Sequence, residues 1–213
     1  LALGDGTNGG LAGNYTFTGG TQTAIIGSAA LAVVTASDAS KTYGTTYTLG
    51  TTAFTATGLQ GSDNISGVTL TSAGAINTAN AGTYAIVPSD AVFSVGSPGN
   101  YTISYVNGTL TVNPYVVNMT GARAYDGTAN VAAGMFTLGP LALGQTLSLS
   151  GSGTIADKNV ANGKTVNTSG ITLVNGTGLA SNYTFTGGTQ TADITPAALT
   201  ATISAPNKVY DGA

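Results

Sequence analysis

Cysteine, histidine and tryptophan are absent from this 213-residue chain, and because all eight acidic residues are aspartate, glutamate is absent too. Without cysteine no disulfide can form, and without cysteine and histidine the chain lacks the preferred zinc ligands and the usual base of a nucleophilic triad. A pair of catalytic aspartates remains conceivable, but no aspartate lies in a segment that suggests a cleft. We therefore expect a protein that is not an enzyme.

Charge is also scarce. Charged residues make up 6% of the chain, and the formal net charge is −3, whereas about 25% of the residues in a typical soluble domain are charged. The five basic residues are scattered, although nucleic-acid binding requires them to be clustered. The longest mainly apolar run, residues 24–34, is about half as long as a membrane span. We expect no nucleic-acid partner and no membrane insertion in this segment.

Internal repetition is the strongest positive signal. Residues 11–31 recur at 179–199 with 17 of 21 positions identical, an offset of 168 (179 − 11). A weaker copy around Asn100 lies halfway between them, so the unit is about 84 residues long and two related domain types alternate. The expected divisions are a domain fragment 1–27, complete domains 28–113 and 114–195, and the opening 196–213 of a further domain.

Two motifs recur once in each unit. The first has a basic residue two positions before a tyrosine, usually followed by Asp-Gly, and comprises Lys41, Tyr43, Arg123, Tyr125, Asp126, Gly127, Lys208, Tyr210, Asp211 and Gly212. The second is Asn-Tyr-Thr, with Asn14, Tyr15, Asn100, Tyr101, Asn182 and Tyr183. We interpret the first motif as structural: the tyrosine fills the interior of its own domain, Asp-Gly closes a turn, and the basic side chain covers the core.

The local pattern is that of β-strands. No segment shows helical periodicity, whereas Tyr101–Val106 and 109–112 alternate apolar and hydroxyl side chains. Asn107-Gly108 and Gly187-Gly188 are typical of two-residue turns, so we expect each unit to end in a β-hairpin. The predicted fold is all-β, a tandem array of small immunoglobulin-like antiparallel β-sandwich domains joined end to end. A period near 84 residues disfavours a β-solenoid.

These residues carry a resemblance to two known domain families. The unit with Lys41, Tyr43 and Gly44, and with segments 80–86 and 100–112, resembles the MBG domain. The unit with the Arg123–Gly127 motif and with segments 156–160 and 163–166 resembles the YDG domain, and we expect the fragments 1–27 and 196–213 to be the end and the beginning of further YDG-like domains. Both families recur in tandem in very large bacterial surface adhesins, including filamentous-haemagglutinin-like proteins exported by two-partner secretion. The resemblance implies an extracellular location at the bacterial cell surface.

Candidate ligand sites are weak. No cofactor is expected, but calcium remains an option because oxygen is the only hard ligand available, and Asp126, Asp157 and Asp193 are its candidates. Solvated turn carboxylates are the alternative interpretation. Asn-x-Ser/Thr triplets are possible glycan acceptors, or arise by chance in a chain rich in threonine; they begin at Asn14, Asn64, Asn100, Asn107, Asn118, Asn167, Asn175 and Asn182.

Two functional hypotheses follow. The first is a structural stalk of an extracellular bacterial adhesin, whose repeats project a distal binding region and whose partners are neighbouring repeats of the same chain. The alternative is that the repeats themselves bind glycans or other copies of the fibre, which would give multivalent adhesion or biofilm contacts.

Overall fold

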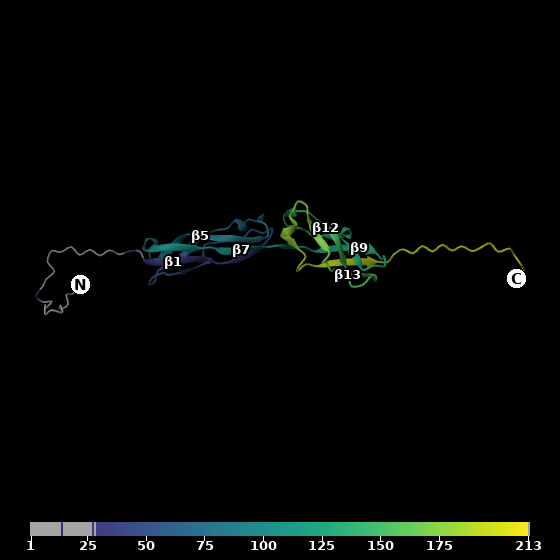
Figure 1. Ribbon diagram of the computed structural model, residues 1–213, viewed down its shortest axis with the longest axis horizontal. Helices are drawn as coiled ribbons and strands as arrows, with labels where there is room; N and C mark the ends of the chain where they lie inside the picture. Colours follow the sequence, from purple (N-terminus) through teal and green to yellow (C-terminus); the bar gives the residue numbers. More distant parts are fainter. Residues whose placement is uncertain (1–13, 15–26, 28, 213) are drawn as a thin grey trace.

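The computed structural model describes residues 14, 27 and 29–212, and its regular elements are strands and three-residue 3₁₀ turns. Figure 1 shows two β-structured bodies in single file. We call residues 29–113 the first unit and residues 115–195 the second unit. Apart from residues 14 and 27, the predicted fragment 1–27, with Tyr15, lies outside the described residues. The prediction of an all-β fold is confirmed.

The first unit is built from two sheets. One has the strand order β3-β1-β6, and the other has the order β2-β7-β5-β4. Its strands are β1 (Ala29–Ala36), β2 (Ala39–Thr42), β3 (Phe54–Thr57), β4 (Asn64–Thr71), β5 (Gly82–Val95), β6 (Tyr101–Val106) and β7 (Gly108–Asn113).

The second unit has a sheet β10-β12-β14, a sheet β11-β9-β16-β13 and a short pair β15-β8. Its strands are β8 (Tyr115–Val116), β9 (Met119–Ala124), β10 (Asn130–Ala132), β11 (Phe136–Leu138), β12 (Leu147–Thr154), β13 (Ala161–Thr165), β14 (Ile171–Asn175), β15 (Tyr183–Thr184) and β16 (Gln190–Thr195).

The sheets are mixed, which corrects the expectation of purely antiparallel pairing. In the first unit, β1 pairs in parallel with β6, and β2 with β7. In the second unit, β8 pairs in parallel with β15, and β9 with β16. Parallel neighbours run in the same direction, so the chain enters each unit at one end and leaves at the other. This pairing produces the single-file arrangement in Figure 1.

Each unit buries a core to which both of its larger sheets contribute. In the first unit, Val34 of β1 and Leu110 of β7 are fully buried in one cluster. In the second unit, Val131 of β10 and Ile194 of β16 are fully buried in another. The alternating burial of β7 matches the alternation seen in the sequence, because successive side chains of a strand point to opposite faces.

The predicted closing hairpins are wrong. Strand β6 lies in the sheet of β1, while β7 lies between β2 and β5, so the chain crosses from one sheet to the other at Asn107. The same crossing separates β15 from β16. Gly108 does not adopt a positive φ. A Cβ on Gly108 would lie 2.6 Å from the carbonyl oxygen of Ala36, so close backbone approach explains this glycine.

Residues 196–212 follow the second unit without forming a strand. Leu199, Ile203, Val209 and Tyr210 are more than four-fifths exposed. Lys208 and Asp211 form an exposed ion pair with a 3.1 Å separation. Within the described part of the chain, no helix is long and apolar enough to cross a membrane.

The crossing at Gly108 generates a test of the fold. We expect Gly108→Ala to lower the free energy of unfolding by about 1–3 kcal/mol, because the added methyl group meets backbone that cannot move easily. Gly99→Ala is the matched control, since its Cβ would find no atom closer than 3.9 Å. Urea denaturation of both variants measures the difference. Equal stability of the two variants would contradict the assignment of Gly108 to a close crossing.

Candidate functional site: the joint between the units

A third buried cluster joins the two units. Only Pro114 separates β7 of the first unit from β8 of the second. The cluster takes residues from both sides of this proline, and we call it the joint; its buried members are Tyr43, Val112, Val117, Ala142 and Tyr183. Because apolar side chains from both units leave water together, the joint resists separation of the units.

Tyr43 belongs to the first unit but packs against the second. It follows β2, and its backbone N–H donates to the carbonyl oxygen of Asn113 at 2.8 Å. Its ring meets Tyr183 edge to face, with centroids 5.6 Å apart and planes at 74°, a geometry worth about 0.5–1.5 kcal/mol beyond burial. Its hydroxyl donates to Oε1 of Gln145 at 3.1 Å. The expectation that this tyrosine fills its own domain is wrong.

Tyr183 is the partner from the second unit. Its hydroxyl donates to the same Gln145 oxygen at 2.7 Å, and an amide oxygen can accept both bonds because it has two lone pairs. Tyr115 adds a second edge contact, with ring centroids 5.9 Å apart. Burial, followed by the neighbouring Tyr43 and Tyr115, raises the pKa of Tyr183 above that of a free tyrosine.

Asn182, the neighbour of Tyr183, ties the second unit to the backbone of the first. Its side chain is almost fully buried, with 1% exposed. Its Oδ1 accepts from the backbone N–H of Ala81 at 2.8 Å, and its Nδ2 donates to Oδ1 of Asn80 at 2.9 Å. Asn182 begins one of the possible glycosylation triplets, but in this arrangement its amide is occupied by the joint.

Gly44 permits the close approach of the units. Its φ is +89°, and a Cβ there would lie 2.7 Å from the Cβ of Ala142 in the second unit. An L-residue at position 44 would therefore meet both backbone strain and a collision across the joint.

Lys41 fixes the backbone of two loops of the first unit that lie beside the joint. Its side chain is buried, and its ammonium donates to the carbonyl oxygens of Ile76 and, at 2.8 Å, Thr45. Burial lowers the pKa of this ammonium. By binding Ile76, Lys41 holds the loop that presents Asn80 and Ala81 to the second unit.

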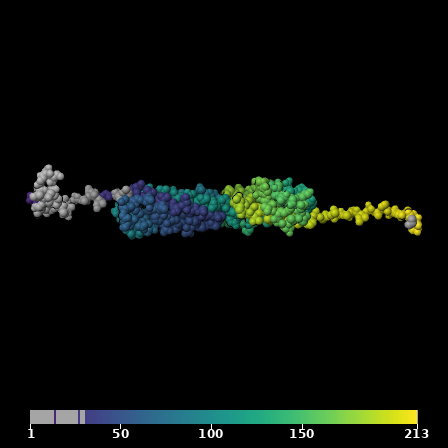
Figure 2. Space-filling model, turned by 90° about the horizontal axis from the view of Figure 1, so that it is seen from below, coloured from purple at the N-terminus to yellow at the C-terminus, as the bar shows by residue number. Residues whose placement is uncertain are grey.

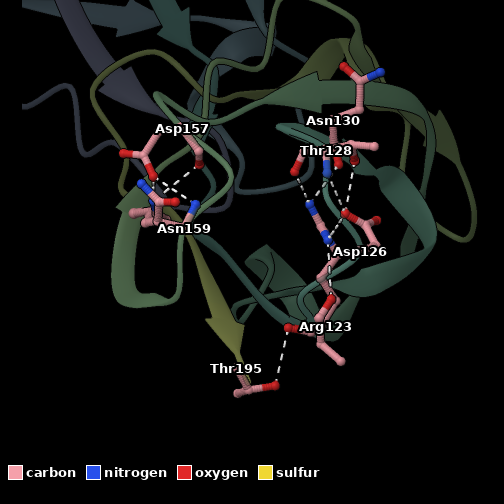
Figure 3. A network of polar contacts seen from close by, with 9 residues as sticks. Arg123, Asp126, Thr128, Asn130, Asp157, Asn159 and Thr195 are labelled. Atoms are coloured by element: carbon pink, nitrogen blue, oxygen red, sulfur yellow. Dashed lines mark hydrogen bonds and ion pairs between the residues drawn. The ribbon is translucent and has the colours of Figure 1, made fainter. Parts of the chain in front are cut away.

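The corresponding motif of the second unit lies away from the joint, beside Thr195, where the last strand β16 ends. Arg123 donates to the carbonyl oxygen of Thr128 at 2.7 Å and pairs with Asp126 (Figure 3). The Asp126 carboxylate accepts from the Thr128 N–H at 2.9 Å, which closes the turn. This hydrogen bond, with further bonds from Thr128 and Arg123, lowers the pKa of Asp126. Tyr125 remains 37% exposed.

The calcium candidates are held apart. Asp157 pairs with Lys164 at 2.6 Å, and this contact, with the N–H of Asn159, lowers the pKa of Asp157. Asp193 accepts from the Gly163 N–H at 2.7 Å, while Asp126 belongs to the turn beside Arg123. Among residues 29–212 the aspartates form no group of three that could hold a metal ion.

The sequence identified both tyrosines of the joint but missed their partners. Gln145 and Ala142 belong to no recurring motif, and Asn80 enters only as the first residue of the MBG-like segment 80–86, with no role assigned to it. One signal was available: both motifs recur once in each unit, with a period of about 84 residues. A common period fits contact between the motifs of successive units.

The buried amide of Asn182 gives a test of the joint. We expect Asn182→Ala to lower the free energy of unfolding by about 1–3 kcal/mol, because the Ala81 N–H, part-buried in the joint, loses its acceptor. Asn100→Ala changes the same motif position in the first unit, where the side chain is exposed, and should cost less than about 0.5 kcal/mol. Urea unfolding compares the two, and an equal cost would show that Asn182 does not couple the units.

The raised pKa of Tyr183 predicts that the folded state loses stability at alkaline pH. Below the ordinary tyrosine pKa of about 10 the folded and unfolded states are both protonated, and the stabilising contribution is complete. Above that value the unfolded chain releases its proton first, so stability falls as the pH rises toward the folded-state pKa. Denaturation at pH 8 and pH 11 should show a larger loss for the natural chain than for Tyr183→Phe. An identical loss would exclude Tyr183 as the titrating group.

The comparisons agree with these two units. The family model of the MBG domain (YGX type) matches residues 32–111, and the model of the YDG domain matches residues 108–192. No curated protein and no solved structure matches the chain. The chain thus carries an MBG-type domain and a YDG domain in tandem, with the joint between them.

Proposed function

We propose that the chain is a non-catalytic stalk segment of an extracellular bacterial adhesin, in which each unit spaces and orients the next. The joint is the observation that carries this proposal. The motif residues Tyr43, Asn182 and Tyr183 contact the neighbouring unit. In a domain that stood alone, these side chains would be exposed to solvent. Domains whose recurring residues contact the neighbouring domains are suited to building a fibre.

The connection between the units supports a stiff spacer. A flexible tether needs several residues, whereas only Pro114 lies between β7 and β8. Figure 2 shows the surfaces of the two units in continuous contact along one axis. We propose that each unit is an immunoglobulin-like sandwich and that the chain lies at a bacterial cell surface, a location with which its MBG-type and YDG domains are compatible.

Binding by the repeats is the second candidate. A groove in the second unit runs between β11 and β12 and is lined by Phe136, Leu138, Pro140 and Leu147 among others. Glycans bound there, or other copies of the fibre, would give many weak contacts along a stalk. A glycan array probed with the whole chain tests this candidate, and retention on defined glycans would favour it over a passive spacer.

Small-angle X-ray scattering tests the spacer directly. We expect the natural chain to give the same extended profile in calcium and in EDTA. Gly44→Ala should bend or loosen the rod, because its methyl group collides with Ala142 across the joint. Gly50→Ala is the matched control, since Gly50 also has a positive φ, of +68°, but its Cβ would lie in open space.

Three outcomes would count against this account. A compact scattering profile of the natural chain would contradict the stalk function. Identical scattering from Gly44→Ala and Gly50→Ala would contradict the assignment of Gly44 to a close contact across the joint. Loosening in EDTA alone would return the aspartates to consideration as calcium ligands.

A further inference from the structure

We propose that the end of the second unit opposite the joint is a docking surface for the Asn100–Tyr101 end of a first unit, here supplied by a second copy of this chain. The contact would reproduce the joint and let the chain associate head to tail. We call the surface around Tyr125, Asn159 and Val160 the far end. The proposal rests on the stalk function and names the partner of the far end.

Tyr125 has the backbone position of Tyr43. Each tyrosine follows a strand that pairs in parallel with the last strand of its unit. The N–H of Tyr43 donates to the last residue of β7, Asn113, and the N–H of Tyr125 donates to the last residue of β16, Thr195, both at 2.8 Å. Tyr43 is 3% exposed beneath the second unit, whereas Tyr125 is 37% exposed. The far end therefore presents the same tyrosine, and in the described part of the chain this tyrosine is partly exposed.

The basic residue of each motif has the same task. Lys41 donates to the carbonyls of Thr45 and Ile76, next to the loop that receives Asn182. Arg123 donates to the carbonyls of Thr128 and Asn130 at 2.7 and 3.2 Å (Figure 3). In both units a cation two residues before the tyrosine fixes the backbone that surrounds it.

Asn159 and Val160 occupy the places of Asn80 and Ala81. In the first unit Gly82, which follows Ala81, pairs with the penultimate residue of β7. In the second unit Ala161, which follows Val160, pairs with the penultimate residue of β16. The register thus places an Asn-x pair at the same edge of both units. Asn159 is exposed, and Val160 is 50% exposed, so both residues are accessible to a docking partner.

The Asn100–Tyr101 end matches the element that docks in the joint. Asn100 and Asn182 each close a 3₁₀ turn, and the tyrosine that follows begins a strand parallel to the first strand of its unit. The Tyr101 hydroxyl donates to Oδ2 of Asp63 at 2.7 Å, as Tyr183 donates to Gln145. The Asp63 carboxylate has lone pairs left for the hydroxyl of an incoming Tyr125.

The sequence itself contains this junction. Residues 11–27 repeat residues 179–195, the end of the second unit, and they run directly into the first unit. A unit ending like the second is therefore followed by a first unit, so their facing ends are expected to be complementary. Within one chain the linker supplies an effective concentration in the millimolar range, so separate copies should associate weakly and need to be trapped.

The absence of cysteine permits a clean trap. We would make Gly99→Cys in one full-length chain, which leaves the Asn100 amide in place, since a Cβ at Gly99 would find no atom closer than 3.9 Å. This chain would be mixed at millimolar concentration with a ¹⁵N-labelled Val160→Cys chain and oxidised glutathione, and mixed dimers identified by mass. The exposed residue Thr172, the second residue of β14, gives the control Thr172→Cys. We expect the Gly99–Val160 dimer to form at least about five times faster than the Gly99–Thr172 dimer, since only the first pair would be brought together by docking.

A further substitution separates docking from random collision. Adding Tyr125→Ala to the Val160→Cys chain should return the rate to that of the control pair. Tyr105→Ala is the matched change, because Tyr105 is also 37% exposed but lies on β6 away from the far end, and it should leave the rate unchanged. Equal rates for the Val160 and Thr172 pairs would overturn the docking surface. An extended scattering profile would still support the stalk in that case, so the two failures are distinguishable.

Discussion

The arrangement depends on the parallel pairing of the strands that begin and end each unit. Strand β2 runs beside β7, and β9 beside β16, so the chain leaves each unit at the end opposite to the one where it entered. Antiparallel pairing of the same strands would have returned the chain to its starting end and favoured folding back. The motif tyrosine comes directly after β2 or β9, which places it at the end where the next unit begins.

The joint forms because the motif tyrosine lies at the end of the first unit that contacts the second unit. A domain of about 80 residues buries only about 60% of its unfolded surface, so burial shared with a neighbour adds to a modest core. Tyr43 and Tyr183 share the oxygen of Gln145, and Asn182 reaches the backbone of Ala81. These contacts are polar bonds inside an apolar cluster, which makes them sensitive to misalignment and favours one relative orientation of the units.

Much of the strand pattern could be read from the sequence, but its pairing could not. Alternation along β7 correctly indicated which side chains are buried, since period two fixes the faces of a strand. The alternation does not indicate which neighbouring element a strand face packs against. For this reason the sequence predicts that Tyr43 lies in the core of its own unit, whereas it lies in the joint. The dipeptide at Gly108 suits both a tight turn and a close backbone crossing, and only the position of Ala36 distinguishes them. Gln145 lies outside every recurring motif, so its role emerges only in three dimensions.

Residual dipolar couplings of the natural chain test the central claim, that the joint makes the two units a single rigid body. Backbone couplings would be measured for residues 29–113 and 115–195 in one weakly aligning medium and fitted separately. We expect the same alignment tensor, in magnitude and in axes, for both units. Two tensors that differ in magnitude would show that the units reorient independently, and the joint could then not transmit direction along a stalk.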